Sequence, residues 1–396
     1  MSTAPYRRNP AIPVGALRAE DCRLDDLLAI LDDTTDLADY PTASAVEQGV
    51  LRYDGATVRA ALAAGRSAEV EAELARAWAA GPGIVVLTGA FEAAVIDRVS
   101  TAYDAIIKQE KETGGPKGDH FGEPGANDRI WNALEKLAVR DPEAFVAYYS
   151  NALVALGARA WLGPGYQVTA QANVVRPGGK AQTVHRDYHL GFMDSAQAAR
   201  YPAHVHALSA VLTLQGAVAH VDMPVEAGPT LYLPHSQKYS HGYLAYWQPD
   251  FQDYFIANHI QLPLTKGDLV WFNPALMHAA GTNVSADIQR MANLLQVSSA
   301  FGRAMESVNR ERVVNAIYPA LLTAINDGMP LDLGDHVVAA SAEGYAFPSN
   351  LDRDQPVGGM APPSQADLAQ TALAERWTSD VLAERLAHQA WTKLSH

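Results

Sequence analysis

The sequence predicts a mainly β fold with helical additions, in which an antiparallel jelly roll or sandwich is flanked by N- and C-terminal helices. Between Tyr166 and Phe301, short apolar stretches alternate with turn sequences such as Pro177-Gly178-Gly179 and Lys266-Gly267-Asp268. Outside this region, apolar residues recur every three or four positions, which is typical of helices. The chain has 396 residues, 48% of them hydrophobic, and a large jelly roll with helical additions can absorb this length as one unit.

The N-terminal part, residues 1–81, is expected to be a helical wrapper around the β core. From Glu20 to about Ala80 the sequence shows helical periodicity, for example at Leu24, Leu27 and Leu31. No group of residues in this part indicates chemistry.

The central part, residues 82–303, is expected to be the catalytic domain. The apolar stretch Gly83–Gly89 predicts a buried strand, and the pattern from about Glu92 to Gln109 predicts a helix. The glycine- and proline-rich stretch Lys111–Asn127 predicts a long loop, either a lid or a surface loop without a role, and Asp128–Asn132 is expected to close it. The strands expected beyond it are Tyr166–Val175, Ala207–Leu214, Thr230–Leu233, Ile260–Leu264, Asp268–Phe272 and Ala292–Ala300.

The C-terminal part, residues 304–396, is expected to be a helical extension. Pro330–Pro363 contains many glycines and prolines and is expected to be a connector, and Asp367–Leu394 predicts a pair of helices.

Composition restricts the partners that the chain can have. The net charge is −14 and no run of lysine or arginine stands out, which argues against nucleic acid. Cys22 is the only cysteine, so neither a disulfide nor a thiolate metal site is expected within one chain. No stretch of 18 apolar residues and no signal-peptide pattern occurs, so we expect a cytoplasmic protein that does not span a membrane.

The strongest chemical signal is the sequence His185-Arg186-Asp187 together with a distant His278. On a strand, residues two positions apart lie on the same face, so His185 and Asp187 can bind one ion together. His278, after the apolar stretch that ends at Phe272, would be the third ligand. Two histidines and one carboxylate are typical of non-haem Fe(II) oxygenases, and Arg290 could bind the carboxylate of a keto-acid co-substrate beside the metal.

Other interpretations of these histidines are weaker. His-Arg-Asp also occurs in the catalytic loop of protein kinases, but the asparagine required five residues later is Phe192 here. His204 and His206 have the spacing of a cupin pair but lack the glutamate that should follow. His189 lies two residues beyond Asp187 and is a weaker candidate for the pocket.

Three segments in this order resemble the phytanoyl-CoA dioxygenase family of Fe(II)/2-oxoglutarate oxygenases. They are His185-Arg186-Asp187, Glu226–Lys238, and Gly267-Asp268-Leu269 through His278 to Arg290. The resemblance covers about residues 82–303 and implies a double-stranded β-helix with Fe(II), 2-oxoglutarate and O₂ at its mouth. The sequence departs from the family pattern at two positions. His235 stands where the family often has glycine, and Gln237 replaces a histidine of the pattern.

The resemblance implies a role for individual residues. His185, Asp187 and His278 would bind the metal, and Arg290 would pair with the far carboxylate of 2-oxoglutarate. Thr230 and either Thr282 or Asn283 would lie near the co-substrate, and Gln171 and Asn173, on the strand before the metal motif, are expected as polar lining that helps to bind it.

The expected function is therefore an Fe(II)/2-oxoglutarate-dependent dioxygenase. It would hydroxylate or otherwise oxidise a C–H bond of a small organic metabolite and release succinate and CO₂. Asp187 favours oxidation over halogenation, because related halogenases have a small residue in its place. Two alternatives stay open: a non-catalytic jelly-roll protein that binds a metabolite, and a zinc-dependent hydrolase with the same ligands. The sequence leaves open whether the substrate is a CoA thioester and whether the protein forms a homo-oligomer.

Overall fold

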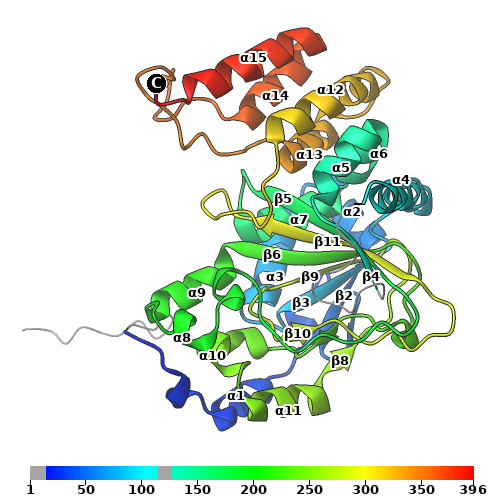
Figure 1. Ribbon diagram of the computed structural model, residues 1–396, viewed down its shortest axis with the longest axis vertical. Coiled ribbons are helices and arrows are strands. Elements are labelled where there is room, and N and C mark those ends of the chain that lie inside the picture. Colours follow the sequence, from blue (N-terminus) through cyan, green and yellow to red (C-terminus); the bar gives the residue numbers. More distant parts are fainter. Residues whose placement is uncertain (1–14, 115–126) are drawn as a thin grey trace, which may run out of the picture.

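The computed structural model describes residues 15–114 and 127–396, and its strands are short. They are β1 (Ala45–Glu47), β2 (Val50–Asp54), β3 (Ile84–Thr88), β4 (Asn127–Ile130), β5 (Gln167–Val175), β6 (Thr213–Ala219), β7 (Leu231–Tyr232), β8 (Ile260–Gln261), β9 (Leu269–Phe272), β10 (His278–Ala279) and β11 (Arg290–Ser298). Eight of them form one sheet in the order β1-β2-β3-β9-β6-β11-β5-β4, and three form a second in the order β10-β7-β8 (Figure 1). The large sheet is mixed, because β2 and β3 pair in parallel and its other neighbours are antiparallel.

Helices surround these sheets. The α-helices are α1 (Leu24–Leu31), α2 (Gly55–Ala63), α3 (Ser67–Ala79), α4 (Ala93–Glu112), α5 (Ala133–Arg140), α6 (Pro142–Tyr149), α7 (Ala152–Leu162), α8 (Ser195–Ala198), α9 (Ala203–Val211), α10 (Gly242–Ala245), α11 (Pro249–Asn258), α12 (Arg310–Asn326), α13 (Leu331–Ser341), α14 (Gln365–Glu375) and α15 (Ser379–Thr392). The short 3₁₀ helices are η1 (Ala19–Asp21), η2 (Leu37–Asp39), η3 (His189–Phe192), η4 (Val225–Ala227) and η5 (Ser236–Lys238). None of the helices described is long and apolar enough to cross a membrane.

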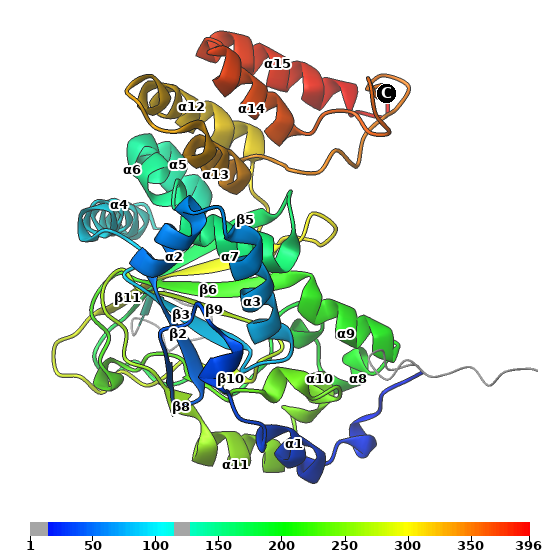
Figure 2. The same cartoon turned by 180° about the vertical axis from the view of Figure 1, so that it is seen from behind.

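The main core lies between the large sheet and the helices on one of its faces. Figure 2 shows α3 and α7 in front of the sheet, where Trp78 and Leu156 pack with Trp271 of β9. Two glycines admit the Trp271 ring, because a Cβ atom at Gly157 or at Gly216 would lie 2.5 Å or 2.4 Å from it. The opposite face of the sheet is therefore left to line a pocket, to which the small sheet also contributes.

The C-terminal helices stack beyond this core, on the side of α5 and α6 (Figure 1). The predicted helix pair at the C-terminus is confirmed as α14 and α15, and α14 begins with a capping box formed by Ser364 and Asp367. The predicted connector Pro330–Pro363 contains a further helix, α13, whose Val337 and Val338 are buried.

Several other expectations need correction. The structure is 47% helical, so it is a large mixed sheet with many helices, and "mainly β" does not describe it. The segment Ala207–Leu214, which was expected to be a strand, is the end of α9 followed by the start of β6. The prediction was wrong because a short apolar stretch has no periodicity that distinguishes a helix from a strand. The stretch from Glu20 to Ala80 contains the helices α1, α2 and α3, but it also contains β1 and β2, which extend the large sheet.

The region of the expected loop at Lys111–Asn127 is only partly described. The helix α4 continues to Glu112, and β4 begins at Asn127. Residues 115–126, on which the prediction of a lid rests, lie outside the described residues. Beyond them, Arg129 of β4 lines the pocket, and Asn132 precedes α5.

Candidate metal and co-substrate site

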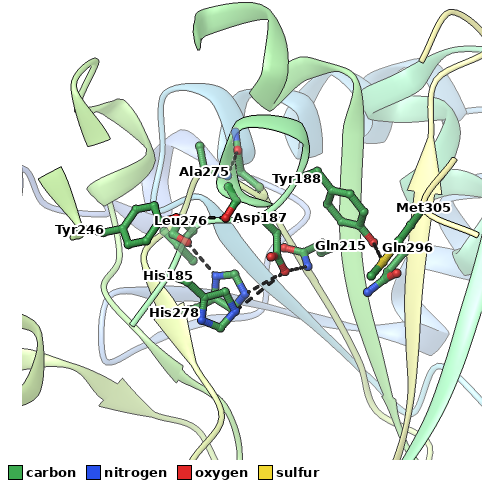
Figure 3. Close-up of polar contacts among 12 residues, drawn as sticks. His185, Asp187, Tyr188, Gln215, Tyr246, Ala275, Leu276, His278, Gln296 and Met305 are labelled. Atoms are coloured by element: carbon green, nitrogen blue, oxygen red, sulfur yellow. Dashed lines mark hydrogen bonds and ion pairs between the residues drawn. The ribbon is translucent and has the colours of Figure 1, made fainter. Parts of the chain in front are cut away.

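The structure brings His185, Asp187 and His278 together. One ligand atom of each lies within 4.8 Å of the others, and Asp187 Oδ2 is 3.9 Å from His185 Nε2 and 3.6 Å from His278 Nε2 (Figure 3). Among the residues described, no other group of histidine, cysteine and acidic residues has this arrangement. Two nitrogens and one carboxylate oxygen around a common point fit a single divalent metal ion.

Both imidazole rings are oriented by the same local contact. His185 Nδ1 lies 2.8 Å from the carbonyl oxygen of Thr183. His278 Nδ1 lies 2.8 Å from the carbonyl oxygen of Leu276 (Figure 3). A carbonyl oxygen only accepts, so each Nδ1 carries the proton and each Nε2 presents a lone pair toward Asp187. Burial, together with the nearby His278, also lowers the pKa of His185, which keeps its ring neutral near pH 7.

Asp187 is held in its ionised form. Gln215 Nε2 donates a hydrogen bond of 2.6 Å to Asp187 Oδ2. Burial disfavours the charge, but His185 and His278 in their protonated forms and the Gln215 hydrogen bond favour it, and together they lower the pKa of Asp187 to about 2. Neutral histidines beside an ionised carboxylate are the protonation states that a metal ion requires.

The backbone fixes the distance between the two histidines. His185 and His278 form an antiparallel bridge, in which each backbone N–H donates to the other's carbonyl oxygen at 2.9 and 3.1 Å. Arg186, between the two ligands of the first motif, points the other way and is buried. Its guanidinium donates to the carbonyl oxygens of Ser236 and of Tyr239, the latter at 3.1 Å, and so anchors the motif to the segment that follows β7.

The triad lines a pocket of about 520 Å³ between the large and small sheets. Arg290, at the start of β11, lines the same pocket and is buried. Its Nη1 donates to the carbonyl oxygens of Gly281 and Ala227 at 3.2 and 3.5 Å. No carboxylate of the described chain pairs with it, and although burial lowers its pKa to about 10, it stays protonated near pH 7.

The remaining expected residues divide into two groups. Thr230, Gln171 and Asn173 line the pocket. Thr282 and Asn283 are not among the lining residues. Asn283 is instead buried in the loop before β11, where its Nδ2 donates to the carbonyl oxygens of Val175 and Ile288.

The other histidines of the described residues lie outside the pocket lining. His206 of α9 contacts the carbonyl oxygen of Ala198, and His189 lies in η3. His235, which replaces a glycine of the family pattern, has a φ of +69°, a backbone conformation that glycine adopts most easily. The turn therefore keeps the glycine-like geometry despite the substitution.

Several pocket residues were not predicted from the sequence. Gln215, Tyr232, Gln296 and Met305 all line the pocket. Tyr232 is paired with His278 in the small sheet, so its place follows from the register of two very short strands. Gln215 lies in β6, but the strand predicted in this region ended at Leu214, so Gln215 was not placed on a strand that faces Asp187.

A comparison with known protein families agrees with this geometry. The sequence profile described as phytanoyl-CoA dioxygenase matches residues 81–292. The curated proteins contain no match to this chain.

Solved structures with a similar fold include three with low sequence identity. SnoN, a non-heme alpha-ketoglutarate-dependent epimerase from nogalamycin biosynthesis, is 18% identical over 59% of this chain and 84% of its own, with a TM-score of 0.37. HygX from Streptomyces hygroscopicus, crystallised with nickel, 2-oxoglutarate and hygromycin B, is 13% identical over 58% and 87%, with a TM-score of 0.39. AviO1 from Streptomyces viridochromogenes Tue57 is 18% identical over 56% and 93%, with a TM-score of 0.40.

Proposed function

The chain belongs to the phytanoyl-CoA dioxygenase family, whose members use Fe(II), 2-oxoglutarate and O₂, and from this membership we propose that it oxidises a C–H bond of a small organic molecule. In the simplest outcome, hydroxylation, the substrate R–H, O₂ and 2-oxoglutarate give R–OH, succinate and CO₂. One oxygen atom of O₂ enters the product and the other enters succinate.

The observation that carries this proposal is the buried charge of Arg290. A buried guanidinium without a carboxylate partner is costly, and within the described residues Arg290 contacts only backbone carbonyls. It lines the same pocket as His185, Asp187 and His278. A dicarboxylate that binds a metal through one end and a guanidinium through the other would compensate this charge.

The roles of the chain's own residues follow from their chemistry. His185, Asp187 and His278 would hold the iron, and Gln215 would keep the Asp187 carboxylate in place. Arg290 would bind the distal carboxylate of 2-oxoglutarate, with Thr230 and Tyr232 in the adjoining wall. When bound, the iron and the keto acid supply the oxidising chemistry, and the pocket positions the target C–H bond and excludes water.

We also propose that the two sheets form the double-stranded β-helix of this class of oxygenases, with residues 82–303 as the catalytic unit between N- and C-terminal extensions. Hydroxylation and a cytoplasmic location are part of the same proposal. Asp187 supports oxidation over halogenation, because its carboxylate fills the position that a chloride ion would need.

Two alternatives use the same pocket. A zinc hydrolase could use the triad, but the buried charge of Arg290 would then lack a partner. A protein that only binds a metabolite would not need two histidines that both present a lone pair toward one carboxylate. Binding of 2-oxoglutarate that depends on both the metal and Arg290 therefore separates the proposal from both alternatives.

Calorimetric titration of Fe(II)-loaded protein with 2-oxoglutarate under anaerobic conditions tests this directly. We expect Arg290→Met to weaken binding roughly 30-fold or more, since loss of one partner from a buried charge pair costs about 2–5 kcal/mol. Arg312→Met, which removes an exposed arginine of α12 that pairs with Glu135, is the control and should bind like the wild type. Equal affinity in wild type and Arg290→Met would contradict the proposed role of Arg290.

A further inference from the structure

Carboxamides dominate the polar lining of the pocket apart from the residues already assigned to the metal and the co-substrate. They are Gln171, Asn173, Gln182, Gln215, Gln252 and Gln296. A carboxamide offers both a donor and an acceptor but no charge. The lining therefore suits an uncharged ligand that can both donate and accept hydrogen bonds.

The orientation of Gln215 is fixed by its neighbour. Its Nε2 donates to Asp187, a carboxylate that can only accept, so Gln215 Oε1 must point elsewhere as an acceptor. Gln215 is 5% exposed, and its Oε1 is buried without a hydrogen-bond partner among the described residues. A buried acceptor without a partner is unfavourable, and 2-oxoglutarate, which has no donor group, cannot satisfy it.

The orientation of Gln296 is fixed from the opposite direction. Arg129 Nη1, which can only donate, is 3.2 Å from Gln171 Oε1, and Gln171 Nε2 is in turn 3.4 Å from Gln296 Oε1. Gln296 therefore accepts from Gln171 and keeps its Nε2 as a donor. In the described part of the chain this Nε2 has no acceptor.

The two side-chain atoms without a partner among the described residues, Gln215 Oε1 and Gln296 Nε2, belong to residues that are directly paired in the sheet. Gln296 of β11 is the antiparallel partner of Gln215 of β6, so their side chains start about 5 Å apart on the pocket face. Figure 3 shows Gln215 beside Asp187, and Gln296 farther away, near Met305. A hydroxyl group between them would accept from Gln296 Nε2 and donate to Gln215 Oε1, which would complete a series of hydrogen bonds from Arg129 to the metal-binding carboxylate.

The mouth of the pocket carries aromatic rings that are more exposed than is usual for such side chains. Phe192 is 55% exposed and Trp247 is 47% exposed, and both line the pocket together with Tyr246. The negative face of an aromatic ring attracts the polarised C–H groups of a hydroxylated ring, and such exposed apolar surfaces often mark a binding site. Aromatic rings next to side-chain carboxamides are suited to a ligand ring whose faces are apolar and whose edge carries polar groups.

Charges argue against a CoA thioester at this site. Among the described lining residues, the charged ones are Arg129, Arg290 and the metal-binding Asp187. The chain as a whole has a net charge of −14. A CoA group carries several phosphate charges, for which the described residues of the lining offer no further lysine or arginine.

We propose that the organic substrate is an uncharged ring compound with several hydroxyl groups, of the sugar or cyclitol type, and that one hydroxyl bridges Gln215 and Gln296. This inference rests on the proposed oxygenase function and names the substrate class for the same pocket.

The test uses the Fe(II)- and 2-oxoglutarate-loaded protein without O₂, in which the visible charge-transfer band reports 2-oxoglutarate and its shift reports a second ligand. The hydroxylated probes are myo-inositol, methyl α-D-glucopyranoside and phenyl β-D-glucopyranoside, and the acyl probes are octanoate and octanoyl-CoA. We expect at least one hydroxylated probe to bind and no acyl probe to bind more tightly. In Gln296→Met, which keeps the length of the side chain, that probe should bind about 10- to 100-fold more weakly, a loss larger than any change in 2-oxoglutarate affinity.

Gln109→Met, on the exposed face of α4, is the matched control and should bind the probe like the wild type. Tighter binding of an acyl probe, binding of neither set, or equal binding to Gln296→Met would overturn the substrate class. In each of these cases a charge-transfer band with 2-oxoglutarate would leave the proposed function standing, whereas loss of that band would remove both.

Discussion

Each histidine of the triad is oriented by a backbone carbonyl two residues before it, Thr183 for His185 and Leu276 for His278. The sequence indicates the triad itself, because His-x-Asp, a distant histidine and an arginine occur in an informative order. It could not indicate the carbonyls that orient the rings, since every residue has a carbonyl group. Nor could it indicate Gln215, because glutamine is common and its contact with Asp187 depends on the position of β6.

Gln215 is expected to matter for metal binding. In Gln215→Met, the Asp187 carboxylate loses its 2.6 Å donor, and such outer contacts typically change metal affinity by roughly 10- to 100-fold. We expect a loss of this size in the affinity for Fe(II), measured by competition with a chromophoric chelator. Gln252→Met changes a pocket glutamine that donates to the Tyr246 carbonyl oxygen and should have little effect. Identical iron affinities for the two variants would show that Gln215 does not position Asp187.

His220 is expected to make the stability of the protein depend on pH. Its ring is buried between Ser100 Oγ at 2.8 Å and Tyr148 Oη at 3.1 Å, and burial lowers its pKa to about 3. An unfolded histidine has a pKa of about 6.5, so between about pH 6.5 and 3 the unfolded state binds a proton more tightly than the folded state. The free energy of unfolding should therefore fall as the pH falls through this range, by at most about 1.4 kcal/mol per pH unit from this residue.

Urea denaturation of His220→Gln measures this contribution. The variant keeps a polar side chain but does not titrate, so its free energy of unfolding should decrease less between pH 6.5 and 4.5 than that of the wild type. Parallel pH profiles for the two proteins would rule out the assigned effect of His220.

At the scale of elements, the prediction succeeded where the pattern was long and regular. The helix at Glu92–Gln109 is confirmed by α4, and the strand at Tyr166–Val175 by β5. The prediction failed at Ala207–Leu214, where a short apolar stretch fits both a helix and a strand. It also missed β2, whose pairing with β3 is a contact between distant segments.

The packing of α7 against the large sheet depends on Gly157. A methyl group at this position would lie 2.5 Å from Trp271 Nε1, and the ring is fully buried and cannot move aside easily. We expect Gly157→Ala to lower the free energy of unfolding by about 1–3 kcal/mol, the usual effect of overpacking a core. Adding Trp271→Leu should make the glycine substitution less costly, because the ring that it meets is removed.

Thermal and urea denaturation of the single and double variants provide the measurement. Gly359→Ala is the control, since nothing lies within 4 Å of the added methyl group. If Gly157→Ala is as stable as that control, α7 does not pack on the Trp271 ring as described.

At the scale of the whole molecule, the pocket is assembled from segments that are far apart in the chain. The segment between β5 and β6 and the strand β10 supply the triad, strands of the large sheet supply Arg290 and most of the carboxamides, and helices cover the other face of the large sheet. The sequence predicts the order of the ligand-bearing segments but not how the two sheets meet, because that depends on many weak contacts at once. The C-terminal helices pack on α5 and α6 and contribute nothing to the pocket lining.

The measurement that tests the central claim most directly is an anaerobic titration of the purified protein with Fe(II) and 2-oxoglutarate, followed by visible absorption. The account predicts a weak metal-to-ligand charge-transfer band in the wild type, no band in His185→Ala, and a much higher 2-oxoglutarate requirement in Arg290→Met. If folded, iron-loaded wild-type protein gives no band at saturating 2-oxoglutarate, the chain does not bind the two cofactors together, and the assignment as an Fe(II)/2-oxoglutarate oxygenase is wrong.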